Sequence, residues 1–261
     1  MTEESRANVV SSFTIVKGAM IEQTYTALAA WDFDRTKRQN LDDIRETNLV
    51  GAGSQTWLRD VCKVLNRRFD PSGRDRPLVL LAKAGWSLDE WKPALLWHMT
   101  RDEFLFRDFL LNWLYPAFVE GRFRLRPEEL EEFLLTVPAR GGTTEHSWSD
   151  STTKRVTVGL LSMAGDFGLL RGSVAREFAS FHLPERSFLY LLHLFRDAEP
   201  SGRRVVESRD WRLFLMGPED VERELLRLHQ FKKLGYEAAG SLVQLSLPWG
   251  SAREFAEKAV A

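Results

Sequence analysis

The sequence is short of cysteine, of net charge and of long apolar runs, and each shortage excludes a class of protein. Cys62 is the single cysteine among the 261 residues, so neither an internal disulfide framework nor a cysteine-rich zinc module can form. Lys and Arg number 36 against 37 Asp and Glu. The formal net charge of -1 excludes a uniformly basic protein that coats nucleic acid, but it allows a local basic face.

A membrane anchor and a signal peptide are also absent from the pattern. No uncharged run approaches the about 20 mostly apolar residues that a membrane-spanning helix needs. The first residues are polar and acidic, whereas a signal peptide begins basic and continues apolar. The sequence therefore predicts a soluble, cytoplasmic protein with no membrane partner.

Apolar residues are plentiful and follow a mainly helical pattern. Hydrophobic residues make up 44 % of the chain, with 9 Trp and 17 Phe, which is enough for a packed core. Helical periodicity with serine caps predicts helices at residues 54–69, 88–99 and 151–167, and a largely apolar one at residues 101–120 that opens on a Thr100–Glu103 capping box. Alternation over residues 236–247 predicts a short β hairpin. We expect a mainly α fold with short β hairpins, divided into helical domains at residues 1–121 and 122–261.

Several strings resemble catalytic motifs but lack the context that their chemistry requires. Residues 32–36 spell the D-x-D-x-T of haloacid-dehalogenase-type phosphatases, which must end a buried parallel strand, and the preceding residues read as a helix. Asp166-Phe167-Gly168 lacks the glycine-rich loop and catalytic loop of a kinase. No histidine pairs with another histidine or a cysteine at metal-ligand spacing. We expect no catalytic residue, no metal and no cofactor.

The first candidate binding segment covers residues 122–181 and is predicted to be a helix-turn-helix or winged-helix element. A helix opening at residue 151 would present hydroxyls and long basic side chains in its first turns, which suits phosphates and base edges. A basic side chain on the following wing would add to this surface. The predicted DNA-binding residues are Ser151, Thr152, Lys154, Arg155 and Arg171. The alternative, given equal weight, is an ordinary capped helix with a solvated first turn.

The second candidate is a helix-turn-helix-like segment at residues 35–76. It holds ten Lys or Arg against six acids, and a basic helix face attracts phosphates without reading sequence. The residues predicted to hold backbone phosphate are Arg59, Lys63, Arg67 and Arg68. The alternative is a solvated charged face.

The order of short motifs along most of the chain resembles the BrxA family of BREX bacteriophage-exclusion loci. The motifs are Ser12-Phe13-Thr14-Ile15-Val16-Lys17-Gly18, Ser54-x-x-Trp57-Leu58-Arg59, Leu65-Asn66-Arg67-Arg68, Ser151-Thr152-x-Lys154-Arg155, Phe167-Gly168-Leu169-Leu170, Trp211-Arg212-Leu213-Phe214 and Pro218-x-Asp220-Val221. The resemblance implies a helical bundle similar to the antitermination factor NusB, a helix-turn-helix element, binding to double-stranded DNA and no catalytic activity.

We therefore expect a non-enzymatic protein of a phage-defence system that binds double-stranded DNA with little sequence specificity. Other defence-system proteins are expected as further partners. Two alternatives stay open at this point: a protein-interaction scaffold in a multi-subunit defence complex, and an RNA-binding factor by analogy with NusB.

Overall fold

The computed structural model describes residues 8–144, 147–240 and 242–260. Helices dominate it, which confirms the predicted mainly α class. The α-helices are α1 (Ser12–Lys17), α2 (Ile21–Ala29), α3 (Lys37–Thr47), α4 (Gln55–Arg68), α5 (Arg76–Lys83), α6 (Leu88–Met99), α7 (Phe104–Phe109), α8 (Tyr115–Val119), α9 (Glu129–Leu135), α10 (Asp150–Asp166), α11 (Glu185–Ala198), α12 (Gly202–Val206), α13 (Pro218–Gln230) and α14 (Ala252–Val260). A π-helical turn, η1 (Leu110–Leu114), and two 3-10 turns, η2 (Pro138–Arg140) and η3 (Arg209–Phe214), complete the helical elements.

The described strands form two antiparallel hairpins. Strand β1 (Leu170–Arg171) pairs with β2 (Glu177–Phe178), with Leu170 opposite Phe178. Strand β3 (Gly235–Ala239) pairs with β4 (Leu242–Ser246), with Gly235 opposite Ser246. The second hairpin confirms the alternation predicted over residues 236–247.

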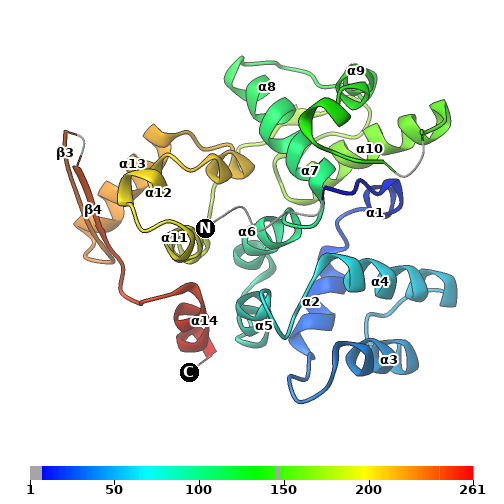
Figure 1. The fold of residues 1–261 in the computed structure, drawn as a ribbon, viewed down its shortest axis with the longest axis horizontal. Helices are drawn as coiled ribbons and strands as arrows, with labels where there is room; N and C mark the ends of the chain where they lie inside the picture. The colour runs from blue at the N-terminus through cyan, green and yellow to red at the C-terminus, as the bar shows by residue number, and fades with distance from the viewer. Residues whose placement is uncertain (1–7, 145–146, 241, 261) are drawn as a thin grey trace.

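Helix α6 lies at the centre of the molecule, and the other elements surround it (Figure 1). It packs against α2, α5, α11 and η3, and its residues from Pro93 to Met99 are all buried. Buried apolar side chains from Val10 to Ala256 form one connected core. The predicted division of the chain into helical domains at residues 1–121 and 122–261 stays a prediction.

Serine side chains start several helices as the sequence predicts. Ser54, Ser87 and Ser149 each accept a hydrogen bond from a backbone N–H in the first turn of α4, α6 and α10, which satisfies a donor that the helix leaves free. The capping box predicted at Thr100 and Glu103 is wrong. Thr100 ends α6 and donates to the Trp97 carbonyl, while Glu103 turns inward to a buried arginine.

The apolar helix predicted at residues 101–120 begins at Phe104 and contains one π-helical turn at Leu110–Leu114. Pro116 explains this turn. Proline has no N–H to donate to the carbonyl four residues earlier, and its ring collides with that carbonyl in a regular α-helix. Widening the preceding turn to the π form relieves the conflict.

Within the described residues, no helix combines the length and the apolar character that crossing a bilayer requires.

Candidate nucleic-acid interface

Helix α10 carries most of the residues predicted for the first candidate segment. The Ser149 side chain accepts from the Thr152 amide at 3.3 Å and lies 3.0 Å from the Ser151 hydroxyl. Ser151, Lys154 and Arg155 are exposed and Thr152 is half-buried. No carboxylate among the described residues pairs with Lys154 or Arg155, so both charges are available to a ligand.

Packing leaves one face of α10 open. Val156, Leu160 and Leu161 are buried in the core. Helix α1 covers the side around Gly159, where an added Cβ would lie 2.9 Å from the Ile15 carbonyl oxygen. The open face therefore holds Lys154, Arg155 and the half-exposed Val158.

A small hairpin follows α10, as the sequence predicts. Strands β1 and β2 are joined through Gly172, whose φ of +93° lies in the left-handed region and whose added Cβ would meet the Ala175 carbonyl at 2.5 Å. Leu125 forms an isolated antiparallel bridge with Arg176, so the segment before α9 lies beside the start of β2. The predicted Arg171 is exposed at the hairpin but pairs with Glu177 at 3.4 Å.

Arg176, which the sequence pattern does not single out, anchors the hairpin to the helix. Its Nη2 donates to the Ser162 hydroxyl at 3.0 Å. The segment before α9 places exposed Arg124 and Arg126 on either side of buried Leu125. Neither guanidinium pairs with a carboxylate among the described residues, although the Arg126 backbone amide donates to Glu129 at 3.0 Å. The alternating basic and apolar residues at 122–126 were the signal for them.

The connection between α9 and α10 departs from a tight helix-turn-helix. It runs over residues 136–149, whereas that motif uses a turn of about three or four residues. The 3-10 turn η2 and a parallel bridge between Val9 and Thr143 occupy this connection. Helix α9, helix α10 and the hairpin of β1 and β2 thus occur in the predicted order, but the connection between the two helices is longer than in that motif.

Helix α4 presents three of the four basic residues predicted for the second segment. Arg59, Lys63 and Arg67 are exposed, and none of them pairs with a carboxylate in the described part of the chain. Arg67 instead donates from Nη2 to the Val9 carbonyl at 2.8 Å.

Arg68 corrects the prediction for this segment. It is fully buried, its Nε pairs with Glu103 at 2.8 Å, and its other nitrogens donate to the Thr14 and Ala19 carbonyls. Arg68 satisfies buried acceptors in the core and cannot reach a phosphate in this fold. The phosphate-contact role predicted for Arg68 is therefore wrong.

Most of the remaining charge in residues 35–76 is neutralised internally. Arg35, Arg38, Arg45 and Arg74 pair with aspartates. Lys37 donates to two carbonyls at the end of α4, and burial lowers the pKa of Lys37 although Asp70 and Asp75 oppose the shift. Half-buried Arg76 lies over the Phe33 ring, so the exposed basic residues of this segment without a carboxylate partner among the described residues are Arg59, Lys63 and Arg67.

The N-terminal segment at residues 8–17 joins the two candidate surfaces. The Val10 amide donates to the Thr143 carbonyl at 2.7 Å beside the link to α10, and Lys17 pairs with Asp60 of α4 at 2.6 Å. Figure 1 shows α1 between α10 and α4. The cations of both helices therefore lie on either side of one short segment.

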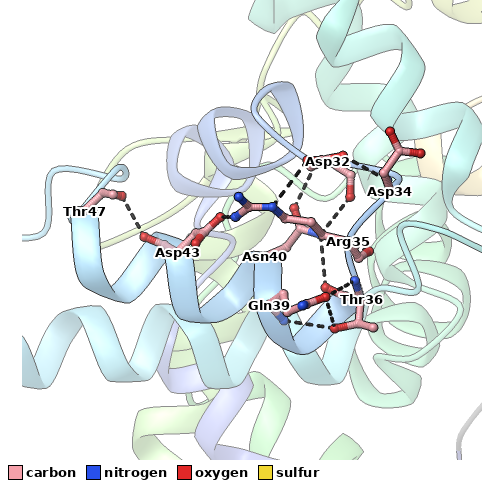
Figure 2. Close-up of polar contacts among 8 residues, drawn as sticks. All are labelled: Asp32, Asp34, Arg35, Thr36, Gln39, Asn40, Asp43 and Thr47. Atoms are coloured by element: carbon pink, nitrogen blue, oxygen red, sulfur yellow. Dashed lines mark hydrogen bonds and ion pairs between the residues drawn. The ribbon is translucent and has the colours of Figure 1, made fainter.

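The phosphatase-like string at residues 32–36 lies in a turn between α2 and α3, as Figure 2 shows. Asp32 accepts from the Asp34 amide at 2.9 Å and pairs with Arg35. Thr36 and Gln39 form a capping box that starts α3. These residues organise a helix start, and no described parallel strand leads into them.

One buried polar network lies away from both surfaces. His98 of α6 contacts Asp75 through Nδ1 at 2.6 Å and the Tyr190 hydroxyl through Nε2 at 2.8 Å. Burial lowers the pKa of His98 against the effect of Asp75. Burial alone would raise the pKa of Asp75, but the hydrogen bond and charge of His98 and the Asp70 amide outweigh it and leave this pKa low. The network joins α5, α6 and α11 within the core.

The fold and these surfaces define a mainly helical protein with two exposed groups of unpaired cations and no cluster of metal ligands among the described residues. The model of the BrxA family matches residues 11–194 of the 261. The chain belongs to the BrxA family, which assigns it to the BREX bacteriophage-exclusion systems. The match ends within α11, so α12, α13 and α14 lie beyond it. No curated protein matches the chain.

Proposed function

We propose that the chain is a non-enzymatic, double-stranded-DNA-binding component of its BREX system, with little sequence specificity. The observation that carries this proposal is the open face of α10, where Lys154 and Arg155 have no carboxylate partner among the described residues and a hairpin follows the helix. In this proposal α10 enters or flanks the major groove and the hairpin acts as a wing. Arg59, Lys63 and Arg67 of α4 hold backbone phosphate.

The charges on α10 favour phosphate and groove contacts from its second turn. Asp150 begins the helix and is exposed, so its carboxylate repels phosphate from the extreme N-terminus. Lys154 and Arg155 lie one turn further along. Their long side chains reach past Asp150 to phosphates or to base edges. Few base-specific donors accompany them, which is why we propose low sequence specificity.

A salt titration tests the proposal. We expect random-sequence duplex to bind with micromolar-scale affinity and to be released steeply as salt rises, because cations on the protein displace counterions from DNA. The measurement is fluorescence anisotropy of a labelled duplex at several salt concentrations. Absence of binding at low salt would overturn the proposal.

The non-enzymatic part of the proposal is tested at the phosphatase-like string. Asp32 belongs to the turn that starts α3, where its acceptor function is structural. We expect the protein to leave a generic phosphate ester intact with magnesium present. Turnover that disappears in Asp32→Asn would contradict this.

A protein-interaction scaffold is the second candidate function, and one observation favours it. Leu226 of α13, Phe231 directly after that helix and Leu242 of β4 are more than half exposed, beyond the part of the chain that the family model matches. Contiguous exposed apolar surface is typical of protein contact sites. Binding to a BREX partner that Phe231→Ala weakens, in a protein that does not bind duplex, would favour this candidate.

A further inference from the structure

An aromatic side chain is exposed among cations where α1 meets α4. Phe13 of α1 is 39 % exposed, while the next two residues, Thr14 and Ile15, are buried. The Lys17 Nζ lies 5.5 Å from the centroid of the Phe13 ring, and the Lys63 Nζ lies 6.0 Å from it. Lys17 also lies 5.7 Å from the ring centroid of half-buried Trp57. We call Phe13, Lys17, Trp57 and Lys63 the aromatic platform.

The composition of the aromatic platform points to nucleic acid as its ligand. Lysine is depleted at the cores of protein–protein interfaces, yet two lysines flank Phe13. Aromatic rings beside cations are how proteins hold single strands, since bases stack on the ring and phosphates follow the charges. Arg59 and Arg67, on the same helix as Trp57, are exposed and lack carboxylate partners in the described chain.

The platform is also held in place before any ligand arrives. Lys17 pairs with the largely buried Asp60 at 2.6 Å, which fixes the lysine between the two rings. Ile15 packs on α10 next to Gly159. A rigid ring loses little conformational entropy when a base stacks on it. Lys63, whose Nζ lies over the Phe13 ring, has no carboxylate partner in the described part of the chain, so its charge can pair with a phosphate.

We propose that the aromatic platform stacks the unpaired bases of a DNA strand that leaves the duplex held by α10. This inference rests on the proposed duplex binding and extends it to junctions between duplex and single strand. The residues at 8–17 contact both helices, so a strand that leaves α10 meets Phe13 as it crosses α1.

The test compares three labelled DNA probes by fluorescence anisotropy: a 12-nucleotide single strand, the same strand with abasic sites throughout, and the duplex of that sequence. The abasic strand keeps the phosphates and removes the bases. We expect the natural strand to bind about tenfold more tightly than the abasic strand, because each stacked base adds to affinity. Phe13→Leu keeps an apolar side chain without a π face, so it should remove this difference and leave duplex binding unchanged.

Phe231→Leu is the matched control, because Phe231 is an exposed phenylalanine near Arg227 on α13. It should bind all three probes like the unaltered protein. The proposal is overturned if Phe13→Leu retains the preference for the natural strand, or if the unaltered protein does not distinguish natural from abasic strands. A thermal melt of Phe13→Leu checks that the variant is folded. If the unaltered protein does not bind the duplex, the proposed function is contradicted instead. The comparison of natural and abasic strands still tests whether bases stack on Phe13.

Discussion

Arg67 and Arg68 are neighbours in the sequence with opposite environments. Arg67 is exposed and donates to one backbone carbonyl. Arg68 is fully buried and pairs with Glu103, which itself is buried and accepts from the Thr14 hydroxyl at 2.9 Å. Arg68 continues the helical stripe of Val61 and Leu65, since it lies seven residues after Val61 and three after Leu65. The periodicity therefore indicated its inward position, although its charge suggested the surface.

We expect Arg68→Met to lower the free energy of unfolding by about 3–5 kcal/mol, because it leaves the Glu103 carboxylate buried without its partner. Arg67→Met is the matched control and should change it by no more than about 0.5 kcal/mol. Urea denaturation measures both. Adding Glu103→Gln to Arg68→Met should recover part of the loss, since the unpaired buried charge is then gone. Equal stability of the Arg68 and Arg67 variants would contradict this account.

At the scale of elements, the two basic helices can be separated by mutation. We expect Lys154→Ala with Arg155→Ala to weaken duplex binding. If both side chains contact phosphates, the slope of log affinity against log salt concentration should become about two units less steep. If both contact bases, each lost contact should cost roughly 1–3 kcal/mol of binding free energy. Anisotropy across a salt series measures both quantities. Thermal stability should barely change, since both side chains are exposed.

Arg59→Ala with Arg67→Ala on α4 is the control for that double variant. It removes the same number of exposed cations from the other helix, so it should reduce affinity through phosphate contacts alone. If it abolishes binding while the α10 variant binds normally, the duplex lies on α4 and the assignment to α10 is wrong. If the α10 variant unfolds, Lys154 and Arg155 are structural.

Helices with a serine cap and a clear periodicity were predictable from the sequence, and short buried ones were not. Helices α6 and α10 lie within about a residue of their predicted bounds, because local capping and an apolar stripe define them. Helix α5 was missed. It is short, lacks a side-chain cap, and is held by packing against α2 and α14 from distant parts of the chain. The π-helical turn depends on the effect of Pro116 on its own helix, which periodicity does not register.

The candidate site was predictable in part for a different reason. Exposed positions such as Lys154 and Arg155 follow from the cap and the apolar stripe of α10. The balance of charges in residues 35–76 does not follow from counting, because pairing depends on the fold: Arg74 neutralises Asp102, and Lys37 caps the end of α4. Phe13 and Lys17 could not be placed beside α4 from sequence, since they precede Trp57 by 44 and 40 residues.

At the scale of the whole molecule, His98, Asp75 and Tyr190 link three helices of the core, and this link is sensitive to acid. The pKa of His98 is below its ordinary 6.5 because of burial. The unfolded chain therefore takes up a proton as the pH falls through 6.5, while the folded chain does so only at lower pH. Stability is complete above this range and declines as the pH falls through it. The lowered pKa of Asp75 acts in the same direction at still lower pH.

We expect the free energy of unfolding to fall between pH 7.5 and 5.5, with His98 contributing at most about 1.4 kcal/mol per pH unit. His98→Asn keeps a donor toward Asp75 but does not titrate, so its stability should decline less steeply. Burial also lowers the pKa of His193, and His193→Asn should reduce the slope independently. Urea denaturation at four pH values measures the slopes. If the free energy of unfolding falls equally steeply with pH in the unaltered protein, His98→Asn and His193→Asn, this explanation is contradicted.

The position of α1 between α4 and α10 has a consequence for synthesis of the chain. Ile15 leaves the ribosome early, but Gly159, which receives it, is made 144 residues later. At roughly 5–20 residues per second, α1 waits on the order of 10–30 s for the part of its binding surface that α10 supplies. During that interval Phe13 and Ile15 are available to chaperones. Nascent chains arrested before residue 150 should therefore be cut by trypsin at Lys17, and chains arrested well beyond residue 166 should be protected there.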